Sequence, residues 1–148
     1  MTTVEHTAVI RPENQPWWPL PLAEGAHIKV LKTDPDNHRV VFLFRFEPGC
    51  VLPEHYHHAK AVAYTVAGEW EYEEGRFQAG DVAYEHVGNR HTPHSENGAE
   101  LLIIFDGDGP GMIDSYLPDG RTISLDIEAF RLLEQGNIPA VLQRLQLA

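Results

Sequence analysis

Three histidines fall within four positions of the segment EHYHHAKAVAY, which runs from Glu54 to Tyr64. His55 and His57 are two residues apart, so on an extended strand both side chains point to the same face. Neutral imidazole nitrogens bind divalent zinc, iron, copper and nickel. We therefore predict that His55 and His57 hold one metal ion, and that His58, on the opposite face of the strand, lies outside the site.

A second cluster, EHVGNRHTPH, contains His86, His91 and His94. In a closed sheet, a neighbouring strand can bring His91 to the His55/His57 pair, and three protein ligands leave coordination positions open for substrate or dioxygen. His94 has the wrong parity to point with His91 and is expected at the rim. A fourth metal position is then filled by His94 or by water. His86 occupies a turn position and is expected to make local hydrogen bonds.

A carboxylate a few residues after His57 would complete a four-ligand site, but the stretch that starts at Ala61 reads AVA. Glu85 is the nearest carboxylate to the second cluster. Because it precedes the turn, we expect a structural or outer role for it, with general base as the alternative. Tyr64 shares a strand face with Val62 and is a candidate to project into a cavity below the metal, the alternative being a core tyrosine.

Short strands must position these residues. The segments HIKVLKT and HRVVFLFRFEPG alternate in polarity, and Phe42, Phe44 and Phe46 share one face, as on the inner side of a closed sheet. The segments AVAYTVAG, EWEYEEG, RFQAGDVAYE and AELLIIFDG follow, and we expect each strand to end at or near a glycine, the first at Gly68. No helical pattern separates them, which indicates an all-β sandwich or barrel.

The C-terminal part differs from the rest. MIDSYLPDGRTISL predicts a hairpin around Pro118-Asp119-Gly120, and DIEAFRLLEQG predicts a helix capped by Asp126 and ended by Gly136. We expect a single domain over residues 1–148, with a barrel core over about 20–106 and the hairpin and helix over about 112–148. The proline-rich NQPWWPLPL segment near the N-terminus is expected to be extended and to cover a barrel end or a subunit interface.

The spacing of the two histidine motifs resembles that of the cupin superfamily, over about residues 20–106. The matching patterns are Gly49-x5-His55-x-His57 and Gly80-x5-His86-x-Gly88-x2-His91. The resemblance implies a small cupin barrel, a double-stranded β-helix or jelly roll, with a metal inside and here a short C-terminal helical tail. Gly68 matches the closing glycine of the first motif. The chain departs from the motifs where glutamate, proline and asparagine are usual, at Ala61 or Val62, His86 and Ser95 respectively.

More narrowly, the segments WWPLPLAEGAHIKVLKTDP, YEEGRFQAGDVAYE and GNRHTP are similar to cupins of the acetylacetone-cleaving and 2,4'-dihydroxyacetophenone dioxygenase-like groups. The acetylacetone-cleaving enzymes bind iron with three histidines and no glutamate. The resemblance implies a neutral site at His55, His57 and His91 that binds Fe(II), or otherwise zinc, nickel or manganese. Such a site favours an anionic chelating ligand, so we expect a dioxygenase that uses O₂ to cleave a C–C bond of a small β-dicarbonyl or hydroxyketone bound as its enolate.

Two other function classes stay open at this point. One is a non-catalytic metal- or ligand-binding cupin of the sensor type, like the zinc-binding cupin domains of some anti-sigma factors. The other is a metal-dependent isomerase or hydrolase, for which Glu85, Tyr64 and His94 are the candidate bases. Cupins commonly associate, so we expect a homodimer.

Bulk composition excludes several partners. The formal net charge of -11 argues against nucleic acid, since phosphate binding depends on clustered Lys and Arg. No apolar run approaches the roughly 20 residues of a membrane span, and the N-terminus lacks the pattern of a secretory signal. A single cysteine, Cys50, rules out an internal disulfide. We expect a cytoplasmic protein that binds no membrane.

Overall fold

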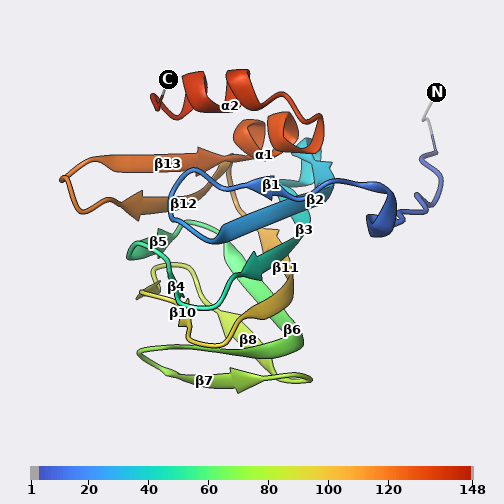
Figure 1. Ribbon diagram of the computed structural model, residues 1–148. Coiled ribbons are helices and arrows are strands. Elements are labelled where there is room, and N and C mark those ends of the chain that lie inside the picture. The colour runs from blue at the N-terminus through green and yellow to red at the C-terminus, as the bar shows by residue number, and fades with distance from the viewer. Residues whose placement is uncertain (1–3, 148) are drawn as a thin grey trace.

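The computed structural model describes residues 4–147, and most of its regular structure is β-strand (Figure 1). The larger of two antiparallel sheets has nine strands, in the order β1-β2-β3-β11-β6-β10-β4, with β7 and β8 also paired to β6. These strands are β1 (Trp18–Pro19), β2 (Ala26–Asp34), β3 (Arg39–Phe46), β4 (Cys50–Val51), β6 (Lys60–Tyr72), β7 (Gly75–Gln78), β8 (Val82–Glu85), β10 (His94–Ser95) and β11 (Ala99–Asp106). The expected all-β class is confirmed.

A smaller sheet, in the order β13-β12-β5-β9, closes the other side of the barrel (Figure 1). Its strands are β5 (His55–His57), β9 (Arg90–His91), β12 (Gly111–Tyr116) and β13 (Thr122–Asp126). Two short 3-10 helices, η1 (Pro12–Asn14) and η2 (Pro35–Asn37), precede β1 and β3. The smaller sheet therefore carries both histidine motifs, and the larger sheet faces them across the interior.

Alternation along β3 explains the core. Phe42, Phe44 and Phe46 are buried on the inner face, as their period-two spacing predicted. The ring of Phe42 lies 5.0 Å from that of Phe105 on β11, edge to face, an arrangement that aromatic quadrupoles favour. At the other end of the barrel the rings of Trp70 and Phe77 stack at 4.4 Å. Apolar side chains thus fill the space on both sides of the histidines.

The long strand β6 changes phase just before Gly68. The sequence pattern predicted a strand end at Gly68, which is wrong, because β6 continues from Lys60 to Tyr72. Gly68 has φ +78°, and a Cβ at this position would lie 2.1 Å from the carbonyl oxygen of Gly98, just before β11. The pairing with β11 shifts register at Val66, since Thr65 and Ala67 face consecutive residues of β11. The irregularity reverses which residues face inward, so Ala61 and Trp70 point to the same interior.

Two helices, α1 (Ile127–Glu134) and α2 (Ile138–Arg144), follow β13. The side chain of Asp126 accepts a hydrogen bond from the Ala129 backbone N–H, which is the predicted helix cap. Helix α1 packs against β2 and places Phe130 5.3 Å from the ring of Phe42. Neither helix in the described part of the chain is long and apolar enough to cross a membrane.

Candidate metal centre

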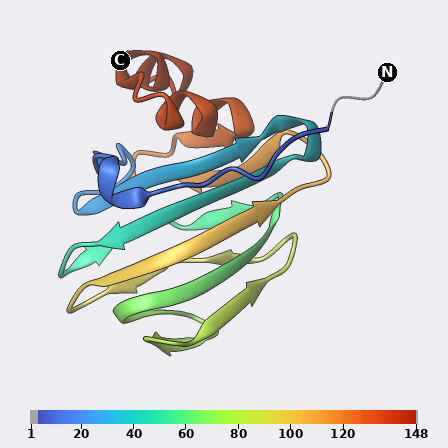
Figure 2. The same ribbon diagram turned by 90° about the vertical axis from the view of Figure 1, so that its right-hand side faces the viewer.

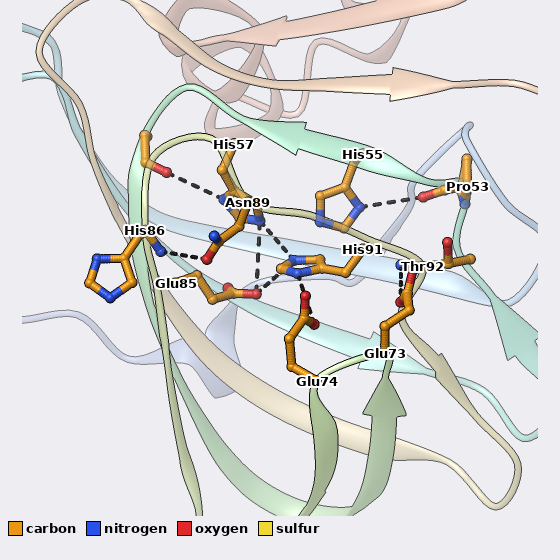
Figure 3. Close-up of polar contacts among 11 residues, drawn as sticks. Pro53, His55, His57, Glu73, Glu74, Glu85, His86, Asn89, His91 and Thr92 are labelled. Carbon is orange, nitrogen blue, oxygen red and sulfur yellow. Dashed lines mark hydrogen bonds and ion pairs between the residues drawn. The ribbon is translucent and has the colours of Figure 1, made fainter.

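The three predicted histidines converge inside the barrel (Figure 3). His55 and His57 lie on β5, and the register of β5 with β9 sets His55 directly opposite His91. One ring nitrogen from each of the three lies within 4.8 Å of the others, and all three side chains are buried. The cluster could therefore hold a divalent metal ion.

Backbone carbonyls orient two of these imidazoles. The Nδ1 of His55 lies 3.4 Å from the carbonyl oxygen of Pro53, and the Nδ1 of His57 lies 3.3 Å from that of Ala59. Because a carbonyl oxygen only accepts, each contact requires the hydrogen on Nδ1. This leaves the Nε2 lone pair free, which is the arrangement that metal-binding histidines commonly use.

The geometry between His57 and His91 fits a cation. Their Nε2 atoms lie 3.0 Å apart within a buried environment. With its proton on Nδ1, His57 directs an Nε2 lone pair at the Nε2 of His91. A hydrogen on the His91 Nε2 satisfies this lone pair in the metal-free protein, and a metal ion would take the place of that hydrogen. Three imidazoles suit zinc, iron, nickel or copper, and are a poor set for calcium or magnesium, which prefer oxygen ligands.

A carboxylate also lies at the histidines. Glu85 is buried, and its Oε2 lies 2.8 Å from the His91 Nε2 and 3.8 Å from the His57 Nε2 (Figure 3). On β8, Glu85 pairs with Ala61 on β6, the position at which the sequence motif lacked its acid. Glu85, for which the sequence predicted a structural or outer role, therefore lies within hydrogen-bonding distance of a predicted metal ligand. The acid missing from one strand is present on the neighbouring strand, on the same inward face.

Two further residues at the site were missed from the sequence. The ring of Tyr72 stacks on that of His91 with centroids 4.1 Å apart. Burial raises the pKa of Tyr72, and the neighbouring Glu85 carboxylate, to which its hydroxyl is hydrogen-bonded, raises it further. Glu74 places a carboxylate oxygen 3.6 Å from the Nδ1 of His91, although its side chain is half exposed. A regular alternation along β6 from Ala61 would point Tyr72 outward, so its inward position follows only from the irregularity at Val66.

The remaining candidates lie elsewhere. Tyr64 is 43% exposed on the outer face of β6, so the expectation that it projects into the cavity is wrong. The inward positions belong to small residues such as Ala61 and Ala63, because Glu85 and the histidine rings occupy the space in front of them. The Nε2 of His94 lies 3.3 Å from Glu71 at the surface, which agrees with a position at the rim.

Two other histidines also lie outside the cluster. His58 contacts Asp114 at 2.8 Å with its side chain 44% exposed, in agreement with the predicted outer face. At the turn, the backbone N–H of His86 donates to the side-chain oxygen of Asn89, while the His86 ring points away from the cluster (Figure 3). Adjacent histidines in the sequence thus have quite different surroundings.

A cavity of about 70 Å³ lies beside the histidines. His55, His57 and Glu85 contribute its polar side chains. Its apolar lining is Phe42, Phe44, Phe46, Leu52, Ala63, Trp70, Pro93, Leu101, Ile103, Phe105 and Ile113. The cavity is far smaller than the several hundred Å³ of typical ligand pockets, and it suits a small molecule with one polar end.

Burial keeps the imidazoles of His55 and His57 neutral. Desolvation, reinforced by the neighbouring His57 and His91, lowers the pKa of His55 to about 3. Desolvation likewise lowers the pKa of His57, although the Glu85 carboxylate opposes this. Neutral imidazole is the form that binds a metal, so the site is prepared for binding at neutral pH.

The metal-free protein is expected to lose stability as the pH falls below neutrality. The pKa of His55 is 6.5 ordinarily and about 3 in the fold, so between these values the unfolded chain binds a proton that the folded chain excludes. The contribution of His55 to the free energy of unfolding is complete above pH 6.5, and it is lost progressively as the pH falls toward 3. At about pH 5, His55 alone lowers the free energy of unfolding by about 2 kcal/mol. Urea titrations of metal-free wild type and His55→Gln across this range measure the effect. Equal pH dependence of the two proteins would contradict the prediction.

Comparison with known proteins places the chain in a family. Residues 5–109 match the family model described as the ChrR cupin-like domain. The chain belongs to this cupin family. Its cupin fold explains why two short motifs, far apart in sequence, meet inside one barrel. No significant match was found among curated proteins.

Solved cupin structures are similar to the chain over most of its length. An RmlC-like cupin from Ralstonia eutropha JMP134 has 24% identity and a TM-score of 0.78, over 91% of this chain and 88% of that one. The acetylacetone dioxygenase of Acinetobacter johnsonii has 16% identity and a TM-score of 0.75, over 92% and 95%. At these identities the likeness shows the fold alone.

A third solved structure comes from the anti-sigma protein ChrR. In the complex of Rhodobacter sphaeroides SigE with ChrR, the anti-sigma chain has 26% identity to this cupin and a TM-score of 0.57. The likeness covers 65% of this chain and 51% of that chain. The expected membership of the cupin superfamily is thus confirmed, and the solved structures that share its fold include an enzyme and an anti-sigma protein.

Proposed function

We propose that this cupin is a metal-dependent dioxygenase that cleaves a C–C bond of a small β-dicarbonyl or hydroxyketone. The observation that carries the proposal is the small apolar cavity that opens onto His55, His57 and the Glu85 carboxylate, beside a cluster of three buried histidines. Fe(II), when bound by His55, His57 and His91, supplies coordination positions for the substrate oxygens and for dioxygen. The similarity of fold to an acetylacetone dioxygenase supports the same reaction class.

The protein's own groups contribute binding and proton transfer. The phenylalanines of β3 and Phe105 exclude water from the cavity and contact the alkyl parts of the substrate. Glu85 lines the same cavity and is the one carboxylate among its lining residues. A β-dicarbonyl must lose a C–H proton to bind as its enolate, and Glu85 is positioned to accept it. The carbon that loses this proton becomes the electron-rich site at which oxygen adds, and both oxygen atoms remain in the two cleavage products.

Tyr72 holds this carboxylate in place. Its ring stacks on His91, and its hydroxyl donates to Glu85, so one side chain fixes both a histidine and the acid. Preorganisation of this kind lowers the cost of arranging the reacting groups.

Oxygen uptake tests the proposal. Metal-free protein is loaded anaerobically with Fe(II), mixed with acetylacetone or a hydroxyacetophenone, and exposed to air-saturated buffer. We expect one O₂ consumed for each substrate cleaved by the Fe(II) form, and none by the Zn(II) form of the same protein. Tight Fe(II) binding without oxygen uptake on any enolisable ketone in the panel would overturn the assignment.

A second function is favoured by the family match itself. The model that matches residues 5–109 describes the cupin-like domain of ChrR, which a solved structure shows in complex with SigE. A non-catalytic role would use the same histidines to hold a metal that changes the affinity for a partner. In that case tight zinc binding without turnover, and a partner interaction that depends on zinc, are the expected results.

A further inference from the structure

The turn that joins β6 to β7 lies against the third histidine of the metal centre (Figure 3). Glu73 and Glu74 are the two residues of this turn, and Tyr72 ends the strand before it. The ring of Tyr72 stacks on that of His91, and the Glu73 carboxylate accepts a hydrogen bond of 2.8 Å from the backbone N–H of Thr92. The Glu74 carboxylate faces the Nδ1 of His91 at 3.6 Å. Three consecutive side chains of one hairpin thus contact the third histidine and its neighbour.

The Nδ1 of His91 has different surroundings from those of the other two histidines. His55 and His57 each have a backbone carbonyl oxygen within hydrogen-bonding distance of Nδ1. At the Nδ1 of His91, residues 4–147 supply no hydrogen-bond partner, although the side chain is only 1% exposed. The Glu74 carboxylate, at 3.6 Å, is slightly too far away for a hydrogen bond. Buried polar atoms without a partner are uncommon in folded proteins, so this nitrogen marks an unfinished contact.

The other ring nitrogen of His91 explains this distance in the metal-free protein. Its Nε2 lies 2.8 Å from the Glu85 carboxylate and 3.0 Å from the Nε2 of His57. Both neighbouring atoms accept hydrogen bonds, since His57 carries its hydrogen on Nδ1. A neutral imidazole has one ring hydrogen, so in His91 this hydrogen belongs on Nε2. The bare Nδ1 then has no hydrogen to donate to Glu74, and the two atoms stay apart.

Metal ligation by His91 reverses this arrangement. A ligating Nε2 cannot carry a hydrogen, so one proton leaves Nε2, one is taken up at Nδ1, and the ring stays neutral. Ligating histidines donate the second ring hydrogen to a carboxylate, a carbonyl oxygen or water. We propose that Glu74 is the positioning residue for His91. In the metal-bound protein its carboxylate accepts the Nδ1 hydrogen and so holds the ring with Nε2 directed at the metal.

Glu74 can make this contact without a change of the fold. Its hairpin lies at the end of the barrel away from the C-terminal helices (Figure 2), and its side chain is 56% exposed. The carboxylate only has to close from 3.6 Å to the roughly 2.8 Å of a charge-assisted hydrogen bond. Glu73 already fixes the turn to the backbone of Thr92, so a side-chain rotation is sufficient. The inference rests on the metal centre and not on the reaction, so it applies equally to a dioxygenase and to a zinc-binding module.

Zn(II) affinity of the full chain, measured by chelator competition, gives the first test. Glu74→Ala is expected to weaken binding about three- to tenfold, less than the usual loss for a buried supporting group because Glu74 is half exposed. Glu74→Gln keeps an acceptor oxygen and is expected to recover about two- to threefold of that affinity, since a neutral hydrogen bond is roughly half as strong. Glu71→Ala is the matched control, because it removes an equal charge from the same hairpin but contacts His94 at the surface. We expect this control to bind Zn(II) as the wild type does.

NMR of the chain labelled with ¹⁵N at histidine gives a readout that a purely structural role would not change. We expect the ring hydrogen of His91 on Nε2 in the metal-free protein and on Nδ1 in the Zn(II) form. In the Zn(II) form of Glu74→Ala, the Nδ1–H resonance is expected to move upfield and to broaden through exchange with water. An unchanged resonance, or wild-type affinity of Glu74→Ala, would overturn the proposal. So would equal losses in Glu74→Ala and Glu71→Ala, since charge alone would then account for both.

Discussion

Replacing His57 by alanine is expected to reduce the affinity for Zn(II) or Fe(II) by about 10²–10³-fold. Structural zinc sites bind with about 10–16 kcal/mol, so one ligand of three or four contributes about 3–4 kcal/mol. His57 is buried among the other ligands, and its Nε2 lies 3.0 Å from that of His91. Competition titration with a chromophoric chelator measures the affinity directly.

The adjacent His58 offers the matched control. It contacts Asp114 on the outer surface, so His58→Ala is expected to bind metal as the wild type does. Thermal melts give an independent reading, because a ligand that binds only the folded state raises the melting temperature. Added metal is expected to stabilise wild type and His58→Ala equally, and to stabilise His57→Ala by about 3–4 kcal/mol less. Equal affinities of the two variants would show that the metal binds elsewhere.

The period of apolar residues and the spacing of histidines in the sequence were sufficient to predict the inward faces of single strands. The alternation of the β3 phenylalanines predicted their inward face, and the parity of His55 and His57 separated them from His58. These are local properties of a single strand, and local geometry determines them. The capping of helix α1 by Asp126 is of the same kind.

What could not be predicted depends on register between strands. Tyr64 was predicted to project inward on the strand face that it shares with Val62, but that face lies outward and the small Ala63 faces the cavity. Tyr72 required the irregularity at Val66, which reverses the phase of β6. No single strand contains the information that Glu85 pairs with Ala61, since it arises only when β8 adds to β6.

The position of Glu85 opposite Ala61 leads to a second prediction with a large effect on metal binding. Glu85→Ala is expected to weaken metal binding by about 10–100-fold, the usual loss when a group that supports the ligands is removed. The Glu85 carboxylate lies 2.8 Å from His91 and is buried, so its negative charge is weakly screened and favours a cation at the histidines. Glu74→Ala is the matched control, because it removes the same negative charge from a neighbouring position. Glu74 is 3.6 Å from the other nitrogen of His91 and half exposed, so a smaller loss is expected.

Moving the acid across the sheet should restore the site. Ala61 and Glu85 are direct partners on neighbouring strands and face the same interior, so the double variant Ala61→Glu/Glu85→Ala exchanges the two side chains at constant total volume. We expect the exchange to recover at least about tenfold of the affinity lost in Glu85→Ala. Ala61→Glu alone crowds two carboxylates together and is expected to destabilise the metal-free protein, through overpacking and like-charge repulsion. An exchange variant that folds, as circular dichroism reports, but binds no better than Glu85→Ala would show that the position of the acid matters and not only its charge in the cavity.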